Sequence, residues 1–103
     1  NGIAKKILHT NELEEFNKKA KDQSVFLAKK FAFKEAFVKA LGTGFREPYY
    51  LDRVEIIKDK LGKPSVVTHG EAKEEFKNLG ITKAHVSLSD TENYVVAFVV
   101  LER

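Results

Sequence analysis

The apolar segment over residues 24–41 is the feature that most constrains how this chain can fold. Its large apolar side chains lie around most of the circumference of a helix; they are Val25, Phe26, Leu27, Phe31, Phe33, Phe37, Val38 and Leu41. Such a helix must be buried on more than one side. Gly42 predicts its end, because glycine readily adopts the left-handed conformation that follows a last helical turn.

The segments around this helix predict a mixture of helices and hairpins. We expect a short helical turn over residues 3–8, then a helix that Thr10 or Asn11 caps and that runs through Ala20. After Pro48 the pattern changes to strands, at residues 53–59 and 65–68 around the turn KLGKP. Thr68 and Glu71 fit a capping box that opens a helix through residue 79.

Two further strands are expected at residues 84–90 and 94–102, on either side of a polar turn at residues 91–93. The second is apolar on both faces, which indicates a central place in a sheet or a buried subunit contact. Helices followed by hairpins predict an α+β fold, a mostly antiparallel sheet packed on helices. The length of 103 residues predicts a single domain over residues 1–103.

Composition and charge exclude several classes of partner and of binding site. The chain has 18 Lys and Arg against 15 Asp and Glu, a net charge of +3 that slightly favours an acidic partner or a phosphate ligand. No dense basic patch points to nucleic acid, and no apolar run is long enough for a membrane span. The absence of cysteine excludes disulfides and thiolate zinc sites. The histidines, His9, His69 and His85, show no metal-ligand spacing.

Glu35 and Lys39 are the charged residues that most need an explanation. At helical spacing they share a narrow stripe with Ala28 and Ala32, where a ligand or another chain can approach closely. One interpretation is an ordinary i,i+4 salt bridge. The other is that Glu35 binds a hard divalent cation while Lys39 neutralises a neighbouring phosphate.

Three other segments have both a structural and a functional interpretation. Gly42, Thr43 and Gly44 fit a helix C-cap and tight turn, or a loop whose backbone N–H groups meet phosphate. Lys63 and Pro64 fit a hairpin turn, or a phosphate contact. His85 fits an ordinary strand histidine, or, with Ser87 on the same face, part of a polar ligand site.

Taken together, these motifs resemble the holo-acyl-carrier-protein synthases, which are small phosphopantetheinyl transferases. The resemblance covers AKKILHTNELEEF, FLAKKFAFKEAFVKALGTGF, VEIIKDKLGKP and HVSLSDTENYVVAFVVLE, nearly the whole chain. Its most specific part is KKFAFKEAFVKALGTG. The resemblance implies the phosphopantetheinyl transferase-like fold. It also implies Mg²⁺-dependent transfer of the phosphopantetheine arm of coenzyme A to a serine of apo acyl carrier protein.

The resemblance also implies roles for individual residues. Glu35 matches the metal-ligand glutamate and Lys39 the lysine beside the diphosphate, both of them catalytic. Around the coenzyme A nucleotide it places Gly42, Thr43, Gly44, Lys63, Pro64, His85 and Ser87. Basic residues of the first helices, Lys5 and Lys6 in particular, would face the acidic carrier protein. A homotrimer with active sites between subunits is implied too, without nucleic acid or membrane as a partner.

One departure from the family concerns the metal site. The family opens with a strand carrying Gly-x-Asp-Ile-Val, whose aspartate is the other protein ligand, and nothing of the kind precedes Asn1. We therefore expect the chain to be incomplete at its N-terminus. The alternative function is a non-catalytic module that binds an acidic protein or coenzyme A. The location expected is the cytoplasm, or a plastid if a targeting segment has been removed, with a role in fatty acid biosynthesis and lipid metabolism.

Overall fold

The computed structural model describes residues 2–90 and 94–103, and in Asp90 the backbone alone. The expected turn at 91–93 lies outside the described residues. The chain folds in the predicted α+β manner, with elements in the order α1 (Gly2–Ile7), α2 (Thr10–Lys18), α3 (Gln23–Leu41), the 3-10 turn η1 (Leu51–Arg53), β1 (Val54–Lys58), β2 (Pro64–Thr68), α4 (Glu71–Asn78), β3 (Lys83–Asp90) and β4 (Val95–Glu102).

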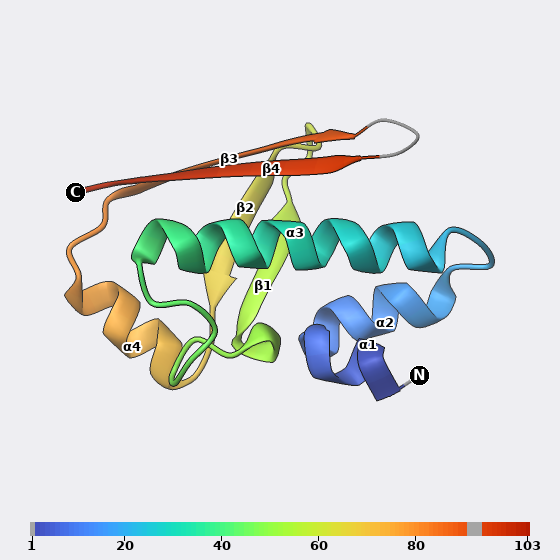
Figure 1. Cartoon of the computed structure of the whole chain (residues 1–103), viewed down its shortest axis with the longest axis horizontal. Helices are drawn as coiled ribbons and strands as arrows, with labels where there is room; N and C mark the ends of the chain where they lie inside the picture. The colour runs from blue at the N-terminus through green and yellow to red at the C-terminus, as the bar shows by residue number, and fades with distance from the viewer. Residues whose placement is uncertain (1, 91–93) are drawn as a thin grey trace.

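Helix α3 is the centre of the molecule, and the two hairpins lie against different sides of it (Figure 1). Strands β1 and β2 pair antiparallel, as do β3 and β4, and among the described residues these are two separate two-stranded sheets. Helices α1 and α2 lie near the N-terminal half of α3, and α4 lies near its C-terminal end (Figure 1). The predicted antiparallel pairing is confirmed.

The main core forms where α3 meets both hairpins and α4. Its buried members are Phe33, Phe37, Val38, Tyr49, Val54, Ile56, Ala72 and Val86. A second, smaller cluster under α1 and α2 contains Ala4, Leu8 and Phe16. In β4 half-buried residues alternate with exposed ones, so that only one face of this apolar strand packs on the core. The other face carries the exposed side chains of Val96, Phe98 and Val100.

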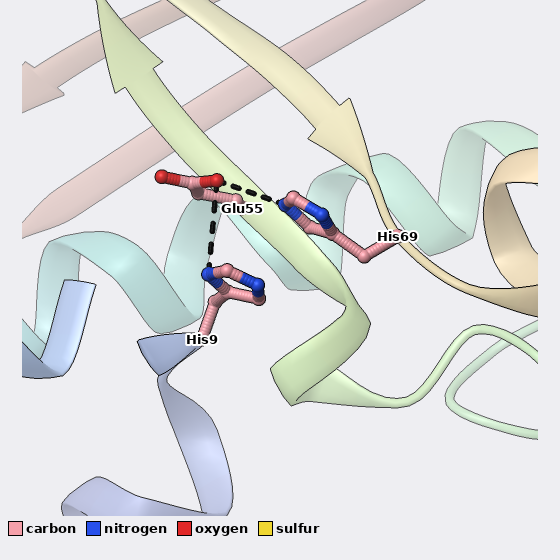
Figure 2. Close-up of side chains that lie close together, drawn as sticks. All are labelled: His9, Glu55 and His69. Carbon is pink, nitrogen blue, oxygen red and sulfur yellow. Dashed lines mark hydrogen bonds and ion pairs between the residues drawn. The ribbon is translucent and has the colours of Figure 1, made fainter. Parts of the chain in front are cut away.

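The N-cap of α2 is His9, so the prediction of Thr10 or Asn11 was wrong. His9 Nδ1 accepts the N–H of Asn11 at 3.2 Å, and Glu12 Oε1 accepts the N–H of His9 at 2.9 Å. An unprotonated ring nitrogen is a hydrogen-bond acceptor, so it replaces the usual hydroxyl or carboxylate oxygen of a cap. Figure 2 shows His9 at the start of this helix, turned toward β1.

The capping box predicted from Thr68 and Glu71 is also wrong. Thr68 is the last residue of β2, buried and paired with Val54 of β1. Gly70 occupies the N-cap position of α4, with no side-chain hydrogen bond. Thr68 pairs with Val54 in the β1–β2 hairpin and lies two residues before the N-cap position, which is too early to cap the helix.

Two lysines of α3, Lys30 and Lys34, lie on the buried face of the helix. They share that face with Phe33, Phe37 and Val38. Lys34 is completely buried, and its ammonium donates three hydrogen bonds, to Ile7 O at 2.7 Å, Glu12 Oε1 at 2.5 Å and Leu51 O at 2.9 Å. An ammonium has three N–H donors, so all of them are satisfied.

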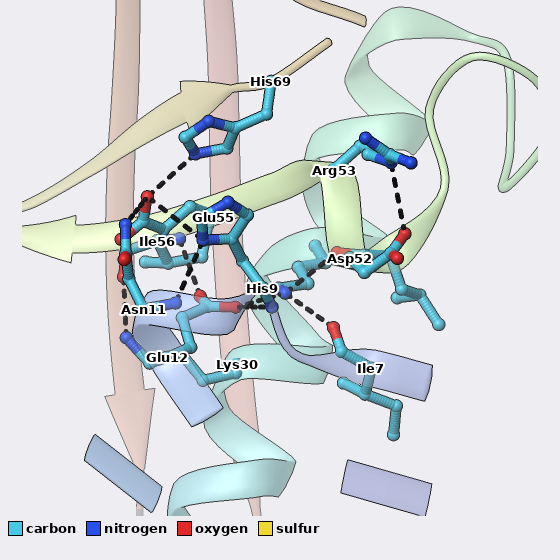
Figure 3. A network of polar contacts seen from close by, with 12 residues as sticks. Ile7, His9, Asn11, Glu12, Lys30, Asp52, Arg53, Glu55, Ile56 and His69 are labelled. Carbon is cyan, nitrogen blue, oxygen red and sulfur yellow. Dashed lines mark hydrogen bonds and ion pairs between the residues drawn. The ribbon is translucent and has the colours of Figure 1, made fainter. Parts of the chain in front are cut away.

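Glu12 joins this lysine to β1. Figure 3 shows Glu12 close to Ile56 of that strand. Its Oε1 contacts Lys34 Nζ and its Oε2 accepts the N–H of Ile56 at 2.8 Å. Lys30 Nζ donates to the carbonyl of the same Ile56 at 2.7 Å and lies over the Phe26 ring. These contacts connect α1, α2, α3, η1 and β1 through buried charges.

Burial lowers the pKa of the Lys34 ammonium, and the charge of Glu12 opposes that shift. Burial likewise lowers the pKa of Lys30. The charged form of each lysine is therefore maintained by its partners rather than by water. Removing one partner of such a pair leaves an uncompensated buried charge.

We expect Lys34→Met to destabilise the protein by about 3–5 kcal/mol, because the Glu12 carboxylate and two backbone carbonyls then lose their donor. Urea denaturation followed by circular dichroism measures the change. Lys73→Met, on the exposed surface of α4, is the matched control and should change stability by less than about 0.5 kcal/mol.

The double variant Glu12→Gln with Lys34→Met completes the cycle. It should be less destabilised than the sum of its single variants, since neither charge is then left alone. Equal losses for Lys34→Met and Lys73→Met would contradict the structural role of the buried pair.

Candidate active site

Glu35 and Lys39 lie together on the outer side of α3. Lys39 Nζ is 4.0 Å from Glu35 Oε2. The side chain of Lys39 is 74% exposed and that of Glu35 is 46% exposed. Such an exposed i,i+4 pair contributes only about 0.2–0.5 kcal/mol to stability. Both groups are therefore available to a ligand at small energetic cost.

The α3 helix ends at Gly42 as predicted. Gly42 has φ of 80°, and its N–H donates to the carbonyls of Val38 and Lys39 at 3.0 Å. The N–H groups of Thr43 and Gly44 also point to Val38 O, at 3.1 and 3.4 Å. In this arrangement the loop's N–H groups complete the helix end, so a phosphate here would have to compete with Val38 O for them.

Lys63 lies in the turn between β1 and β2, directly before Pro64. Asp59 organises that turn, because its Oδ1 accepts the N–H groups of Leu61 and Lys63 at 2.9 and 2.8 Å. The Lys63 side chain is exposed, and Pro64 begins β2. The hairpin predicted around LGKP is confirmed.

His85 and Ser87 lie on the exposed face of β3, as the alternation of the strand predicted. His85 Nε2 is 2.9 Å from Glu102 Oε1 of β4. Thus Glu35 and Lys39 meet, whereas Lys63 and His85 are engaged in their own hairpins. Among the described residues, no hydrogen bond or ion pair joins the Glu35–Lys39 pair, Lys63 and His85 to one another.

Sequence reasoning missed one group of potential ligands. His9 and His69 lie beside each other with ring centroids 3.9 Å apart, and both approach Glu55 of β1 (Figure 2). The histidines show no metal-ligand spacing along the sequence, but the fold brings His9 and His69 together beside a carboxylate. Ligand spacing along the chain reveals sites within one motif, whereas this cluster joins residues far apart in sequence.

Glu35 has the chemistry that a hard divalent cation requires. Its carboxylate is half-exposed, and Mg²⁺ is commonly held by one or two carboxylates together with phosphate oxygens and water. Among the residues that the structure describes, no further acid or histidine forms a metal-binding cluster with Glu35. Such an ion would therefore take only Glu35 from the described residues and would complete its ligands with groups outside them.

In the described ranges, no helix is both long and apolar enough to cross a membrane.

Comparisons with known proteins agree with the fold and the motifs. Residues 1–99 match the 4'-phosphopantetheinyl transferase superfamily. The chain is 46% identical over 100 residues to the holo-[acyl-carrier-protein] synthase of Dechloromonas aromatica (strain RCB), an alignment that covers 97% of this chain and 78% of that protein.

Solved structures give the same result. The holo-[acyl-carrier-protein] synthase of Neisseria meningitidis superposes with a TM-score of 0.92 at 40% identity, over 100% of this chain and 82% of that one. The Helicobacter pylori synthase, solved in complex with coenzyme A, has a TM-score of 0.79 at 25% identity, over 98% and 82% of the two chains. The chain therefore belongs to the 4'-phosphopantetheinyl transferase superfamily and, within it, to the holo-[acyl-carrier-protein] synthases.

Proposed function

We propose that this protein transfers the phosphopantetheine arm of coenzyme A to a serine of apo acyl carrier protein, with Mg²⁺ bound at Glu35. The observation that carries the proposal is the Glu35–Lys39 pair on the outer side of α3, in a chain 46% identical to a holo-[acyl-carrier-protein] synthase. The buried Lys34 directly before Glu35 fixes the orientation of this pair.

In this reaction the serine oxygen forms a bond to the phosphorus that bears the pantetheine arm. The bond from that phosphorus to the bridging diphosphate oxygen breaks, and adenosine 3',5'-bisphosphate leaves. Lys39 donates hydrogen bonds to the diphosphate and stabilises the charge that develops on the leaving group. A water or a carboxylate accepts the serine proton. Glu35 would hold a divalent cation, which would supply further stabilisation of the charge on the phosphate oxygens.

The coenzyme A nucleotide would contact the remaining site residues predicted from sequence, which are Gly42, Thr43, Gly44, Lys63, Pro64, His85 and Ser87. The exposed ammonium of Lys63 is a suitable phosphate partner. The hydroxyl of the partly buried Thr43 donates to Gly44 O at 2.9 Å and would have to give up that hydrogen bond to reach a phosphate. These site residues lie in three places, which are the loop after α3, the β1–β2 hairpin and β3. A site between neighbouring subunits would combine residues from two chains around one ligand, which a site within one subunit could do less readily.

The outer face of β4 supports such an assembly. Val96, Phe98 and Val100 are 45%, 63% and 57% exposed there, in adjacent alternate positions of one strand. A contiguous apolar face of this kind is typical of an interface between proteins. We propose a homotrimer in which this face is covered by neighbouring copies.

The acidic carrier protein would dock near α1. Lys5 and Lys6 lie exposed in the last turn of this helix and provide positive charge for an acidic surface. We propose that residues 1–103 belong to one transferase domain, which is incomplete at its N-terminus. A cytoplasmic location and a role in fatty acid biosynthesis stay predictions.

The decisive experiment incubates the protein with apo acyl carrier protein, coenzyme A and Mg²⁺, and weighs the carrier protein by mass spectrometry. The expected product carries one added phosphopantetheine. Coenzyme A binding in calorimetry without any mass increase would favour the alternative, a module that binds coenzyme A but does not catalyse transfer.

We expect Glu35→Gln to lower Mg²⁺-dependent turnover by about 100-fold or more, because the amide removes the charge that holds the cation. Binding of Mn²⁺, followed by electron paramagnetic resonance in the presence of coenzyme A, should weaken in parallel. Glu14→Gln, an exposed acid of α2, is the control and should keep both properties. Unchanged Mn²⁺ affinity in Glu35→Gln would exclude the ligand role.

Lys39→Ala should lower kcat by about 100-fold, a loss typical of removing one donor to a developing anion. Stability should change by less than about 0.5 kcal/mol, because the residue is exposed. Lys39→Arg should recover part of the rate, and Lys77→Ala on α4 should leave it unchanged. A normal rate in Lys39→Ala would show that this lysine has no part in catalysis and only forms a surface salt bridge with Glu35.

Phe98→Glu should convert the proposed trimer into monomers, since it places a charge in the apolar face of β4. Light scattering after size-exclusion chromatography measures the mass. Leu61→Glu is the matched control, because Leu61 is 94% exposed in the β1–β2 turn and distant in sequence from the proposed interface. A monomeric wild-type protein, or a trimeric Phe98→Glu variant, would contradict this interface.

A further inference from the structure

His9, Glu55 and His69 form a cluster that the proposed transferase reaction does not use. His9 precedes α2, Glu55 lies in β1 and His69 follows β2, so three separate segments meet at one point (Figure 2). His69 Nε2 is 2.8 Å from Glu55 Oε1, and His9 Nδ1 is 3.7 Å from the same oxygen. Both imidazoles therefore converge on one carboxylate oxygen.

The separations suit a metal ion. One potential ligand atom from each residue lies within 4.8 Å of the other two. In a tetrahedral site with bonds of about 2.0 Å, ligand atoms lie roughly 3.3 Å apart. The observed distances of 2.8 and 3.7 Å lie on either side of that value. The two rings are stacked with their planes only 13° apart, so one of them must turn before both nitrogens can face the same ion.

The surroundings partly shield the cluster and orient its carboxylate. Glu55 is 8% exposed, and the side chains of His9 and His69 are 17% and 29% exposed. Asn11 Nδ2 donates to Glu55 Oε1 at 3.3 Å and helps to orient the carboxylate. Hydrogen-bonded ligands that approach from fixed elements are a common property of metal sites.

From these contacts we infer that His9, Glu55 and His69 bind one transition-metal ion of the Zn²⁺ class, separately from the cation proposed at Glu35. Two imidazoles and a carboxylate are suitable for Zn²⁺, Co²⁺ or Ni²⁺, whereas Mg²⁺ prefers oxygen ligands alone. One coordination position remains for water.

The Nδ1 atom of His9 also caps α2, and this second role affects how much His9 can contribute to metal affinity. This atom accepts the N–H of Asn11 in the cap. A metal at Nδ1 must displace that hydrogen bond, or the ring must turn and offer Nε2. We therefore expect His69 to contribute more to affinity than His9.

The site would be structural. It ties the start of α2 to both strands of the first hairpin, next to the contacts of Glu12 with His9 and Ile56 (Figure 3). A metal that binds only the folded chain stabilises it by mass action. Zn²⁺ should therefore raise the melting temperature of the protein.

The test is a titration of the untagged protein with Co²⁺ in excess Mg²⁺, followed by the visible absorption of the bound ion, with Zn²⁺ used to displace it. One equivalent should bind. His69→Phe keeps an aromatic ring in the stack and His9→Ser keeps a good helix cap. Affinity should fall by about 10- to 100-fold or more in each, with the larger loss in His69→Phe. His85→Gln is the control and should bind as the wild type does.

Nuclear magnetic resonance of the wild-type protein gives a measurement that does not depend on variants. Addition of Zn²⁺ should shift the imidazole C–H signals of His9 and His69 and leave those of His85 unchanged. Absence of saturable Co²⁺ binding, or equal affinity in His69→Phe and the wild type, would overturn the proposal. Because transferase activity is not a readout, failure here leaves the proposed function untouched.

Discussion

The ammonium of Lys34 is the group on which the arrangement of the molecule depends. It donates to Ile7 O, Glu12 Oε1 and Leu51 O, which belong to α1, α2 and η1. A lysine in this position fixes the rotation of α3 about its own axis. The next residue, Glu35, is turned by about 100° in a helix of 3.6 residues per turn, which carries it out of the core. One buried contact thus determines where the proposed cation ligand points.

A buried ion pair is a costly way to connect these elements. Apolar side chains of similar volume often stabilise a protein as well or better, because the charges must give up their hydration. They would not, however, define which carbonyls face α3. Lys34 and Lys30 specify Ile7, Leu51 and Ile56 individually, since each carbonyl accepts a directed hydrogen bond. Our interpretation is that these lysines are retained for orientation more than for stability.

The periodicity of the sequence was sufficient for the helices, the hairpins and the exposed Glu35–Lys39 stripe. It also contained an unused signal, since Lys30, Phe33, Lys34, Phe37 and Val38 follow the spacing of a single helical face, which places both lysines in the core. The cap at His9 is a local contact, but histidine is not a preferred N-cap residue, so the pattern favoured Thr10 or Asn11. The cluster of His9 with Glu55 and His69 could not be predicted in this way, because it arises from contacts between the start of α2 and the β1–β2 hairpin.

The charges of the chain separate into two chemical environments. Glu35 and Lys39 are exposed and face solvent, where a cation shared with a diphosphate can enter and leave with the substrate. His9, Glu55 and His69 are largely enclosed and come from three segments, an arrangement in which a bound ion would exchange slowly and act on the fold. The proposed catalytic cation would take only Glu35 from the described residues, whereas the inferred structural ion finds three ligands among them.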